Sequence, residues 1–583
     1  MTSHRIVSHL NAEHSASNPP EDGRALARLR RVERSGAWRR VISRLALAVG
    51  LACAWTMRAT AAPASPELTA KIDSLFAKWA KPDSPGVIVA IAQGGETIHA
   101  RGYGMANLEH GVPLTPDTIS ESGSVAKQFT AAAVVLLSLR GRLSLDESIR
   151  KHLPEMAASI CDSITVRMLL NHTSGLRDIH GLNDLLGRPS YSSQHDNAGV
   201  LRVMSRQRRL NFEPGTEYLY CNASYVLAAI IVERVGGKSF NAFCEEELFR
   251  PRGMTHTRWR DDFVAVVPGR ASGYAPRRGG GYRIDLPYSN IVGSGGLLTT
   301  VGDLLKWNAS LEGATGEWAE LARLLQTPSR LKNGRAINYG LGLTIDEATP
   351  GRREISHGGS TSGYRTFLTR LPEHRLAVAL LGNAADFDGA AASRAVLQAV
   401  LGSPRTERPK GIKLGAAELA AAAGMYHSAQ ADSLVTLTVR DGRLHQGATA
   451  LIPTGPGTFA NANGRAELVF GGGSQRSFVL TTTNEVVTYS AVATATPTAA
   501  QLVAYAGTYY SEELEVVCKV TVRDGKLSLG RWPEPERTGE PTFADGFRFA
   551  GGWHATFTRD ASGRVTGCEL TNGRCRRVRF ERR

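Results

Sequence analysis

Residues 124–139, SVAKQFTAAAVVLLSL, set the architecture of this chain. The stretch is apolar on almost every side, which predicts a helix buried inside a large domain. Gly123 stands at its start and Gly141 just past its end, as helix boundaries prefer. Within it, Ser124 and Lys127 lie one turn apart on the same face. The sequence therefore places a hydroxyl and an amine side by side in a buried region.

Ser124 and Lys127 are residue types that can act as a nucleophile and its general base. A serine hydroxyl attacks well only when a neighbouring group takes its proton. Burial lowers the pKa of a lysine, so a neutral Lys127 amine can accept the proton of Ser124. The free N–H of Ser124 in the first helical turn suits a developing oxyanion. The alternative is a helix cap beside a surface lysine, because this spacing arises by chance about once or twice in so long a chain.

A second motif, Tyr220-Cys221-Asn222, precedes an apolar helix predicted over residues 224–235. A tyrosine at such a junction can pass a proton to a leaving group, and an asparagine amide can hold a substrate carbonyl. Cys221 is expected to pack rather than to act as a second nucleophile. A similar triplet at residues 288–290 (YSN) runs into a glycine-rich stretch and is expected to be a loop. Alone, either tyrosine would be an ordinary, partly buried aromatic.

A third motif, His357-Gly358-Gly359, opens a strand-like hairpin predicted over residues 364–381. Glycines at a strand start let a substrate backbone approach, and the N–H of Ser360 is a candidate second oxyanion donor. His357 would offer a hydrogen bond or a positive charge to a carbonyl or anionic group. A single histidine before two glycines is otherwise usually a turn residue.

In this order, Ser-x-x-Lys, Tyr-x-Asn and His-x-Gly resemble the penicillin-binding protein and serine β-lactamase superfamily, on the branch of class C β-lactamases, esterases and D-stereospecific peptidases. Similar stretches stand at residues 169–176 (LLNHTSGL), 295–300 (GGLLTT) and 339–343 (YGLGL). Asp303, after the second of these, is expected to form a capping box with Thr300 rather than to catalyse.

The resemblance implies roles for individual residues. Ser124 is the implied nucleophile, and Lys127 and Tyr220 are the implied proton-transfer pair. Asn222 and His357 are the implied substrate contacts, and neither a metal nor a cofactor is implied. Most β-lactamases carry lysine where His357 stands, and a histidine is charged only part of the time near neutral pH. This difference argues against efficient β-lactamase activity.

Several functions remain open at this point. The His-x-Gly motif, the cysteine inside Tyr-Cys-Asn and a C-terminal extension look most like D-aminopeptidases and related hydrolases. Among the possible enzyme activities, a D-amino-acid aminopeptidase or peptidase is the first choice, an esterase the second and a β-lactamase the third. The substrate would be a small molecule or a peptide, for example one derived from peptidoglycan. The alternative of another class is a catalytically silent protein that binds envelope glycan or peptide.

Residues 1–61 are expected to be a leader outside the fold. Basic residues precede an apolar run at 45–55, and an Ala-Thr-Ala sequence follows at 59–61, as in a secretory signal peptide. A periplasmic or secreted protein is expected, and lipoprotein anchoring is disfavoured. No later segment is long enough to cross a membrane. The leader holds ten arginines against four acids, which leaves +9 of the net charge of +15 for the rest, so nucleic-acid binding is not expected.

The length predicts several domains. A β-lactamase-like α+β domain, an antiparallel sheet built from both ends and flanked by helices, is expected over 62–403, with a linker at 404–413. Two copies of a β-rich unit follow, over 414–495 and 496–583, with their Tyr and Arg-Asp-Gly motifs offset by 83 residues. Each copy should form an all-β barrel or sandwich, which the resemblance suggests is lipocalin-like and able to cover the cleft.

The six cysteines after the leader show no dense disulfide framework. Cys568 and Cys575 flank an expected two-residue turn, Asn572-Gly573, which would pair Cys575 with Leu570, so no bridge is expected. The basic cluster over 574–583 is expected to be a solvated strand end.

Overall fold

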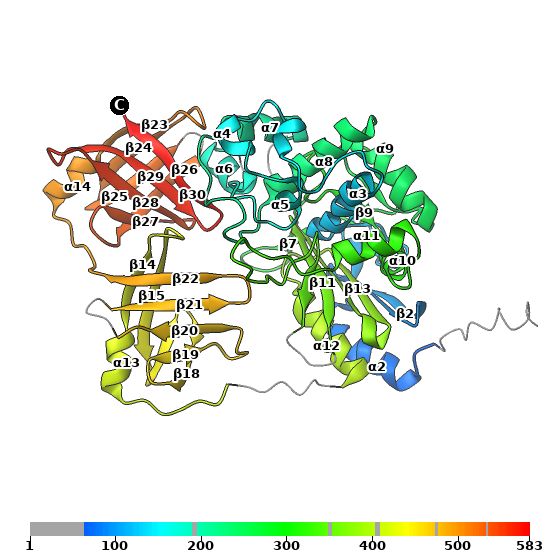
Figure 1. Ribbon diagram of the computed structural model, residues 1–583. Helices are drawn as coiled ribbons and strands as arrows, with labels where there is room; N and C mark the ends of the chain where they lie inside the picture. Colours follow the sequence, from blue (N-terminus) through cyan, green and yellow to red (C-terminus); the bar gives the residue numbers. More distant parts are fainter. Residues whose placement is uncertain (1–62, 189–194, 348–351, 403–408, 473–475, 532–533) are drawn as a thin grey trace, which may run out of the picture. The chain divides into compact units, whose positions relative to one another are not determined.

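The computed structural model describes residues 63–188, 195–347, 352–402, 409–472, 476–531 and 534–583 (Figure 1). The proposed leader at 1–61 and residues 404–408 of the proposed linker lie outside these residues. Within them, no helix combines the length and the apolar character needed to span a membrane. The fold class predicted from the sequence is confirmed: a mixed helix and sheet domain is followed by all-β domains.

The first domain is built on a six-stranded antiparallel sheet. Its strands, in spatial order, are β10 (Thr344–Asp346), β11 (Glu354–Thr361), β12 (Tyr364–Leu371), β13 (Leu376–Gly382), β1 (Val87–Gln93) and β2 (Glu96–Tyr103). Strand β1 pairs with β13, so the two ends of the domain sequence meet in one sheet, as predicted. Two buried clusters cover the two faces of this sheet, because alternate residues of β1 point to opposite sides.

One face of the sheet is covered by α2 (Pro66–Phe76) and α12 (Gly389–Leu401), which pack against Val87, Val89 and Ile91 of β1. The other face carries the larger helical layer. Its helices are α3 (Lys127–Leu139), α4 (Ala158–Cys161), α5 (Val166–Leu170), α6 (Ile179–Leu185), α7 (Asn197–Ser205), α8 (Asn222–Gly236), α9 (Phe240–Cys244), α10 (Val301–Leu311) and α11 (Glu317–Leu325). Small strands join this layer: β5 (Ser120–Glu121), β9 (Leu297–Thr299) and β6 (Arg258–Trp259).

Two local predictions are corrected. The helix does not start at Ser124: a 3₁₀ turn, η2 (Gly123–Ala126), comes first, and α3 begins at Lys127. The turn begins at Gly123, whose φ of +52° lies in the left-handed region that favours glycine. The His357-Gly358-Gly359 motif lies inside β11 instead of preceding a strand, because β11 pairs with β12 over residues 355–361.

Two β-rich units form the C-terminal part of the described chain. The first is a nine-stranded antiparallel sheet: β14 (Gly424–Ser428), β15 (Ser433–Arg440), β16 (Arg443–Gln446), β17 (Thr449–Ala450), β18 (Ile452–Gly455), β19 (Thr458–Ala460), β20 (Ala466–Phe470), β21 (Ser477–Thr482) and β22 (Val486–Val492). A short helix precedes each unit, α13 (Ala416–Ala422) and α14 (Ala499–Tyr505), again 83 residues apart.

The second unit is a closed eight-stranded barrel, coloured orange to red in Figure 1. Its strands are β23 (Gly507–Ser511), β24 (Val516–Arg523), β25 (Lys526–Arg531), β26 (Glu534–Pro541), β27 (Gly546–Phe549), β28 (Trp553–Arg559), β29 (Val565–Asn572) and β30 (Cys575–Arg582). We call the β29–β30 pair and its turn the terminal hairpin.

The turn of the terminal hairpin differs from the prediction. Asn572, not Leu570, pairs with Cys575, and Leu570 pairs with Val578 across an irregularity in register. The two-residue turn is therefore Gly573-Arg574. This shift places Arg574 at the tip of the hairpin. All six cysteines after the leader are free and buried.

Candidate active site

Ser124 and Lys127 form the centre of the site. Serine stands in the 3₁₀ turn η2 and lysine begins α3, and this places the Nζ atom of Lys127 3.1 Å from the Oγ atom of Ser124. The same Nζ lies 2.8 Å from Oδ1 of Asn222 and 2.6 Å from the backbone oxygen of Ser294. The Lys127 side chain is fully buried.

Burial lowers the pKa of Lys127 to about 7; nearby Asp178 opposes this effect and the positive charge of Arg574 adds to it. A neutral amine has two N–H donors and one lone pair. Asn222 Oδ1 and the Ser294 carbonyl can only accept, so they take the two N–H groups. The lone pair then faces the Ser124 hydroxyl, which is the arrangement that a general base requires.

Tyr220 lies next to this pair. Its ring centroid is 4.8 Å from Lys127 Nζ and 4.2 Å from the ring of His172. Burial raises the pKa of Tyr220 well above its ordinary value, while a hydrogen bond with Ser124 acts in the opposite direction. The group is therefore a neutral phenol, a proton donor rather than a base.

Asn222 is held in place by a carboxylate that sequence reasoning missed. Asp178 accepts from the backbone N–H of Asn222 at 2.6 Å and from its Nδ2 at 2.9 Å, which turns Oδ1 towards Lys127. Asp178 is buried and also caps α6 through the N–H of His180. In the sequence, Asp178 stands two residues after the 169–176 stretch and just before an apolar segment. An acid in that position predicts only the N-cap of a helix.

The oxyanion region depends on two glycines. A Cβ on Gly359 would lie 2.0 Å from the backbone oxygen of Ser122 and 3.2 Å from the backbone nitrogen of Ser124. A Cβ on Gly123 would lie 2.6 Å from the backbone nitrogen of Ser360. Strand β11 and turn η2 thus touch through their backbones. This contact brings the two proposed N–H donors, those of Ser124 and Ser360, to the same end of the site.

His357 is a neutral ring whose two nitrogens are both engaged. Nδ1 lies 2.7 Å from the carbonyl of Gly358, which only accepts, so Nδ1 carries the proton. Nε2 lies 2.9 Å from the hydroxyl of Tyr339 and accepts from it. Burial and the neighbouring Lys127 lower the pKa of His357 to about 4. Of the two roles left open by the sequence, the lowered pKa disfavours the positive charge. Both ring nitrogens already bond within the protein, so a hydrogen bond from His357 to a substrate stays a prediction.

All seven sequence-predicted site residues belong to one region. A cavity of about 720 Å³, the size of typical ligand sites, is lined by Ser124, Tyr220, Asn222, His357, Gly359 and Ser360, with Lys127 buried behind Ser124. Arg574 of the terminal hairpin lines the same cavity and was not predicted from the sequence.

Three other predicted residues have different surroundings. Cys221 is buried, and burial raises the pKa of its thiol to about 12, which fits the expected packing role. Thr300 caps α10 by accepting from the N–H of Asp303, but the Asp303 carboxylate bonds His256 and Thr257 and does not close a capping box. Tyr288 is 46% exposed, in an irregular segment as expected.

Comparison with known proteins places this geometry in a family. The Beta-lactamase family model matches residues 72–402. A D-aminopeptidase of Brucella anthropi is 32% identical over 317 residues, covering 53% of this chain and 57% of that enzyme. A D-aminopeptidase of Cereibacter sphaeroides is 26% identical over 458 residues, covering 76% of this chain and 83% of that enzyme.

Among solved structures, the octameric penicillin-binding protein homologue from Pyrococcus abyssi has the same fold, with a TM-score of 0.51 and 21% identity over 81% of this chain and 99% of that one. The chain spans under two thirds of the length of the Brucella anthropi enzyme. The matched family region contains the complete cavity centre, from Ser124 to Ser360. The chain therefore belongs to the beta-lactamase family, the penicillin-binding-protein-like serine hydrolases.

Proposed function

We propose that this protein is an exported serine hydrolase that forms an acyl-enzyme on Ser124 and acts as a D-amino-acid aminopeptidase or peptidase. The observation that carries the proposal is the contact of 3.1 Å between the Ser124 hydroxyl and a buried amine whose pKa is about 7. Near neutral pH, about half of the molecules then hold the base in its reactive form.

In the acylation step, Lys127 takes the proton of Ser124 as Oγ bonds to the substrate carbonyl carbon. The carbonyl oxygen gains the negative charge and accepts from the N–H groups of Ser124 and Ser360. The bond to the leaving group then breaks, and the phenol of Tyr220 donates a proton to the departing nitrogen or oxygen. Lys127, now protonated, restores the proton of Tyr220, so the balance closes.

In the deacylation step, water replaces the leaving group in the cavity. Lys127, neutral again, accepts a proton from the attacking water, whose oxygen bonds to the acyl carbon. The bond from that carbon to Ser124 breaks, and the serine oxygen recovers a proton from Lys127. The free acid leaves, and the enzyme returns to its starting state.

The choice of a D-amino-acid substrate rests on the relatives, which are D-aminopeptidases by name. An esterase is the second candidate, because the same step cleaves an activated ester without a change in geometry. A β-lactamase is the third, because His357 stands where most β-lactamases carry a lysine and its lowered pKa leaves it neutral. The export proposal rests on residues 1–61 of the sequence alone.

The class of the protein is tested by labelling. The purified chain is incubated with a fluorophosphonate, and its mass is compared with that of Ser124→Ala treated alike. We expect one adduct on Ser124 and none on the variant. If no acylating probe labels the chain, the proposal fails in favour of a silent envelope-binding protein.

The reaction is tested with a matched substrate series. D-Alanine p-nitroanilide, its L-isomer, p-nitrophenyl acetate and a chromogenic cephalosporin are compared under one set of conditions. We expect a higher kcat/KM for the D-anilide than for its L-isomer. A higher preference for the ester, with no stereoselectivity on the anilides, would instead establish the esterase.

A further inference from the structure

Arg574 brings a positive charge from the C-terminal barrel into the hydrolase cavity. It stands at the tip of the terminal hairpin, and its guanidinium carbon lies 4.9 Å from the ring centroid of Tyr220. The family region ends at residue 402, so this contact comes from outside it. The cavity of the hydrolase domain is therefore completed by a residue of another domain.

The backbone at this tip is fixed from two sides. The carbonyl of Arg574 accepts from the N–H of Asp178 at 3.2 Å and from Nδ2 of Asn211 at 2.9 Å. The thiol of Cys575 donates to the carbonyl of Asp178 at 3.1 Å, and the N–H of Arg576 donates to Oδ1 of Asn211 at 2.8 Å. The hairpin is thus held by the same Asp178 that positions Asn222.

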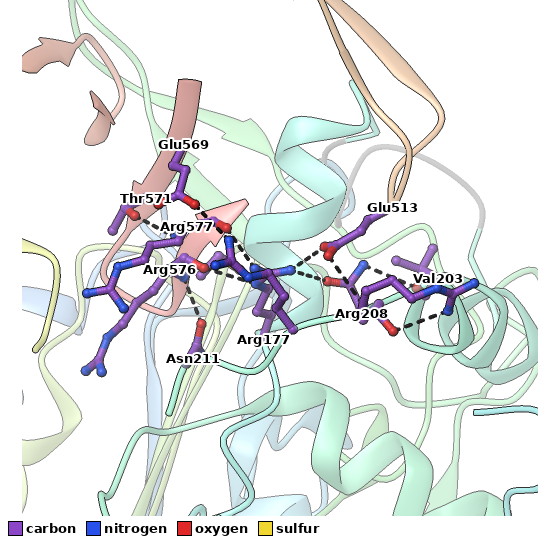
Figure 2. Close-up of polar contacts among 12 residues, drawn as sticks. Arg177, Val203, Arg208, Asn211, Glu513, Glu569, Thr571, Arg576 and Arg577 are labelled. Atoms are coloured by element: carbon purple, nitrogen blue, oxygen red, sulfur yellow. Dashed lines mark hydrogen bonds and ion pairs between the residues drawn. The ribbon is translucent and has the colours of Figure 1, made fainter. Parts of the chain in front are cut away.

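Figure 2 shows the polar contacts around Arg177, which include residues 576 and 577 of the terminal hairpin. Arg177, which is 1% exposed, donates to the carbonyls of Arg576 at 3.1 Å and Arg577 at 2.8 Å and forms an ion pair with Glu513 of the barrel. Burial of such a charge is costly unless it is paired and hydrogen-bonded, so this contact requires a defined geometry. The backbone of the hairpin tip, from which the Arg574 side chain extends, is consequently held in place by contacts that do not involve that side chain.

Among the described residues, the Arg574 guanidinium has no carboxylate partner. The side chain is exposed to the cavity, and its recorded contact is the ring of Tyr220. A planar guanidinium with free donors binds a carboxylate in a bidentate manner, and the aromatic face fixes its orientation. We therefore expect an anionic group of the substrate to bind the Arg574 guanidinium.

We propose that Arg574 binds the free C-terminal carboxylate of the leaving residue, so that the preferred substrates are D-dipeptides rather than D-amino-acid amides or esters. The inference rests on the proposed function and makes its substrate class more specific. Arg574 is a specificity-determining residue that touches substrate but takes no part in proton transfer.

The position of Tyr220 explains why the carboxylate lies on the leaving side. In the proposed mechanism Tyr220 protonates the leaving nitrogen. In a dipeptide the terminal carboxyl carbon is only two bonds from that nitrogen, so it must lie beside the Tyr220 hydroxyl. The Arg574 guanidinium, 4.9 Å from the Tyr220 ring centroid and lining the same cavity, is the cation available there. A carboxylate on the acyl side would instead lie across the scissile bond from it.

The kinetic test compares two substrates that differ only in this carboxylate, D-Ala-D-Ala and its C-terminal amide. Wild type should prefer the free acid. In Arg574→Gln, kcat/KM for the acid should fall about 10- to 100-fold, mainly through KM, because a hydrogen bond to a charged group is lost. The amide should change far less. Arg574→Lys should recover part of the preference.

The control is Arg579→Gln, because Arg579 lies on β30 near Arg574 but is 64% exposed and pairs with Glu581. It should leave both substrates unchanged. An effect of Arg574 on the Lys127 pKa acts on both substrates alike and cancels in the acid-to-amide ratio. Equal losses on acid and amide in Arg574→Gln would overturn the inference while leaving the proposed function intact.

A binding experiment distinguishes the role of Arg574 from the proposed hydrolase function. Binding of the acid and of the amide to Ser124→Ala is measured by calorimetry, with and without Arg574→Gln. Tighter binding of the acid that disappears with Arg574→Gln supports the inference even if wild type hydrolyses neither substrate, in which case only the proposed function fails. D-Glu amide serves as a probe with an acyl-side carboxylate; a dependence on Arg574 for this probe alone overturns the leaving-side assignment.

Discussion

The pH dependence of Ser124 acylation should report the charge of Lys127. Only the neutral amine accepts a proton, so the acylation rate should rise with pH through an apparent pKa near 7. Arg574 lowers this pKa, because a nearby positive charge disfavours the ammonium form. Replacing Arg574 with glutamine should therefore raise the pKa of Lys127 and move the rising limb to higher pH.

The size of this shift follows from two distances. Lys127 Nζ lies 4.8 Å from the ring centroid of Tyr220, and the Arg574 guanidinium carbon lies 4.9 Å from it. These two lengths limit the separation of the charges to about 10 Å, at which two unit charges repel by about 0.4 to 1.7 kcal/mol for effective dielectric constants of 80 to 20. At about 1.36 kcal/mol per pKa unit, the expected shift is at least about 0.3 to 1.2 pH units, since a shorter separation would increase the repulsion.

The assay is the rate of inactivation by an uncharged fluorophosphonate between pH 5 and 9. Wild type, Arg574→Gln and the Arg579→Gln control are measured at low salt, because salt screens the interaction. An uncharged probe avoids any effect on carboxylate binding. A limb that stays in place or moves to lower pH in Arg574→Gln would refute the reasoning, and so would a wild-type rate that does not vary with pH.

Three further changes should have distinct effects. Asp178→Asn removes the negative charge that raises the Lys127 pKa, so the same limb should move to lower pH; a move upward would contradict the assigned sign. Gly359→Ala inserts a methyl group 2.0 Å from a backbone oxygen and should reduce acylation about 100-fold or more, whereas Gly472→Ala, in open space, should have no effect on the rate or on thermal unfolding. Arg177→Met leaves a buried partner charge unpaired and should weaken docking of the terminal hairpin by about 3 to 5 kcal/mol; hydrogen exchange in the hairpin should then accelerate, and unchanged exchange would exclude an anchoring role.

Much of this fold could be predicted from the sequence, because its signals are local. The apolar stretch after Ser124, the paired strands over 364–381 and the 83-residue repeat each follow from patterns within a few tens of residues. The cavity centre was also predictable, because the three motifs are short and each contains its own chemistry. Strand β11 was missed, since glycines in the middle of a strand read as a turn.

The long-range part of the site was not predictable. Asp178 reads as a helix cap, and its contact with Asn222 depends on how α6 and α8 pack. Arg574 reads as one of several arginines near a strand end. Its place in the cavity depends on a one-residue shift of the hairpin turn and on docking between domains. Neither the shift of the turn nor the docking of the domains can be predicted from a pattern of neighbouring residues.

The terminal hairpin also sets the order in which this enzyme matures. Arg574 lies 450 residues after Ser124, counted as 574 less 124. At ribosomal rates of about 5 to 20 residues per second, the arginine is made about 20 to 90 s after the serine. A nascent hydrolase domain accordingly has an open pocket without its cation throughout that interval. With the proposed role of Arg574, selectivity for the free acid is acquired only after the C-terminal barrel has been made.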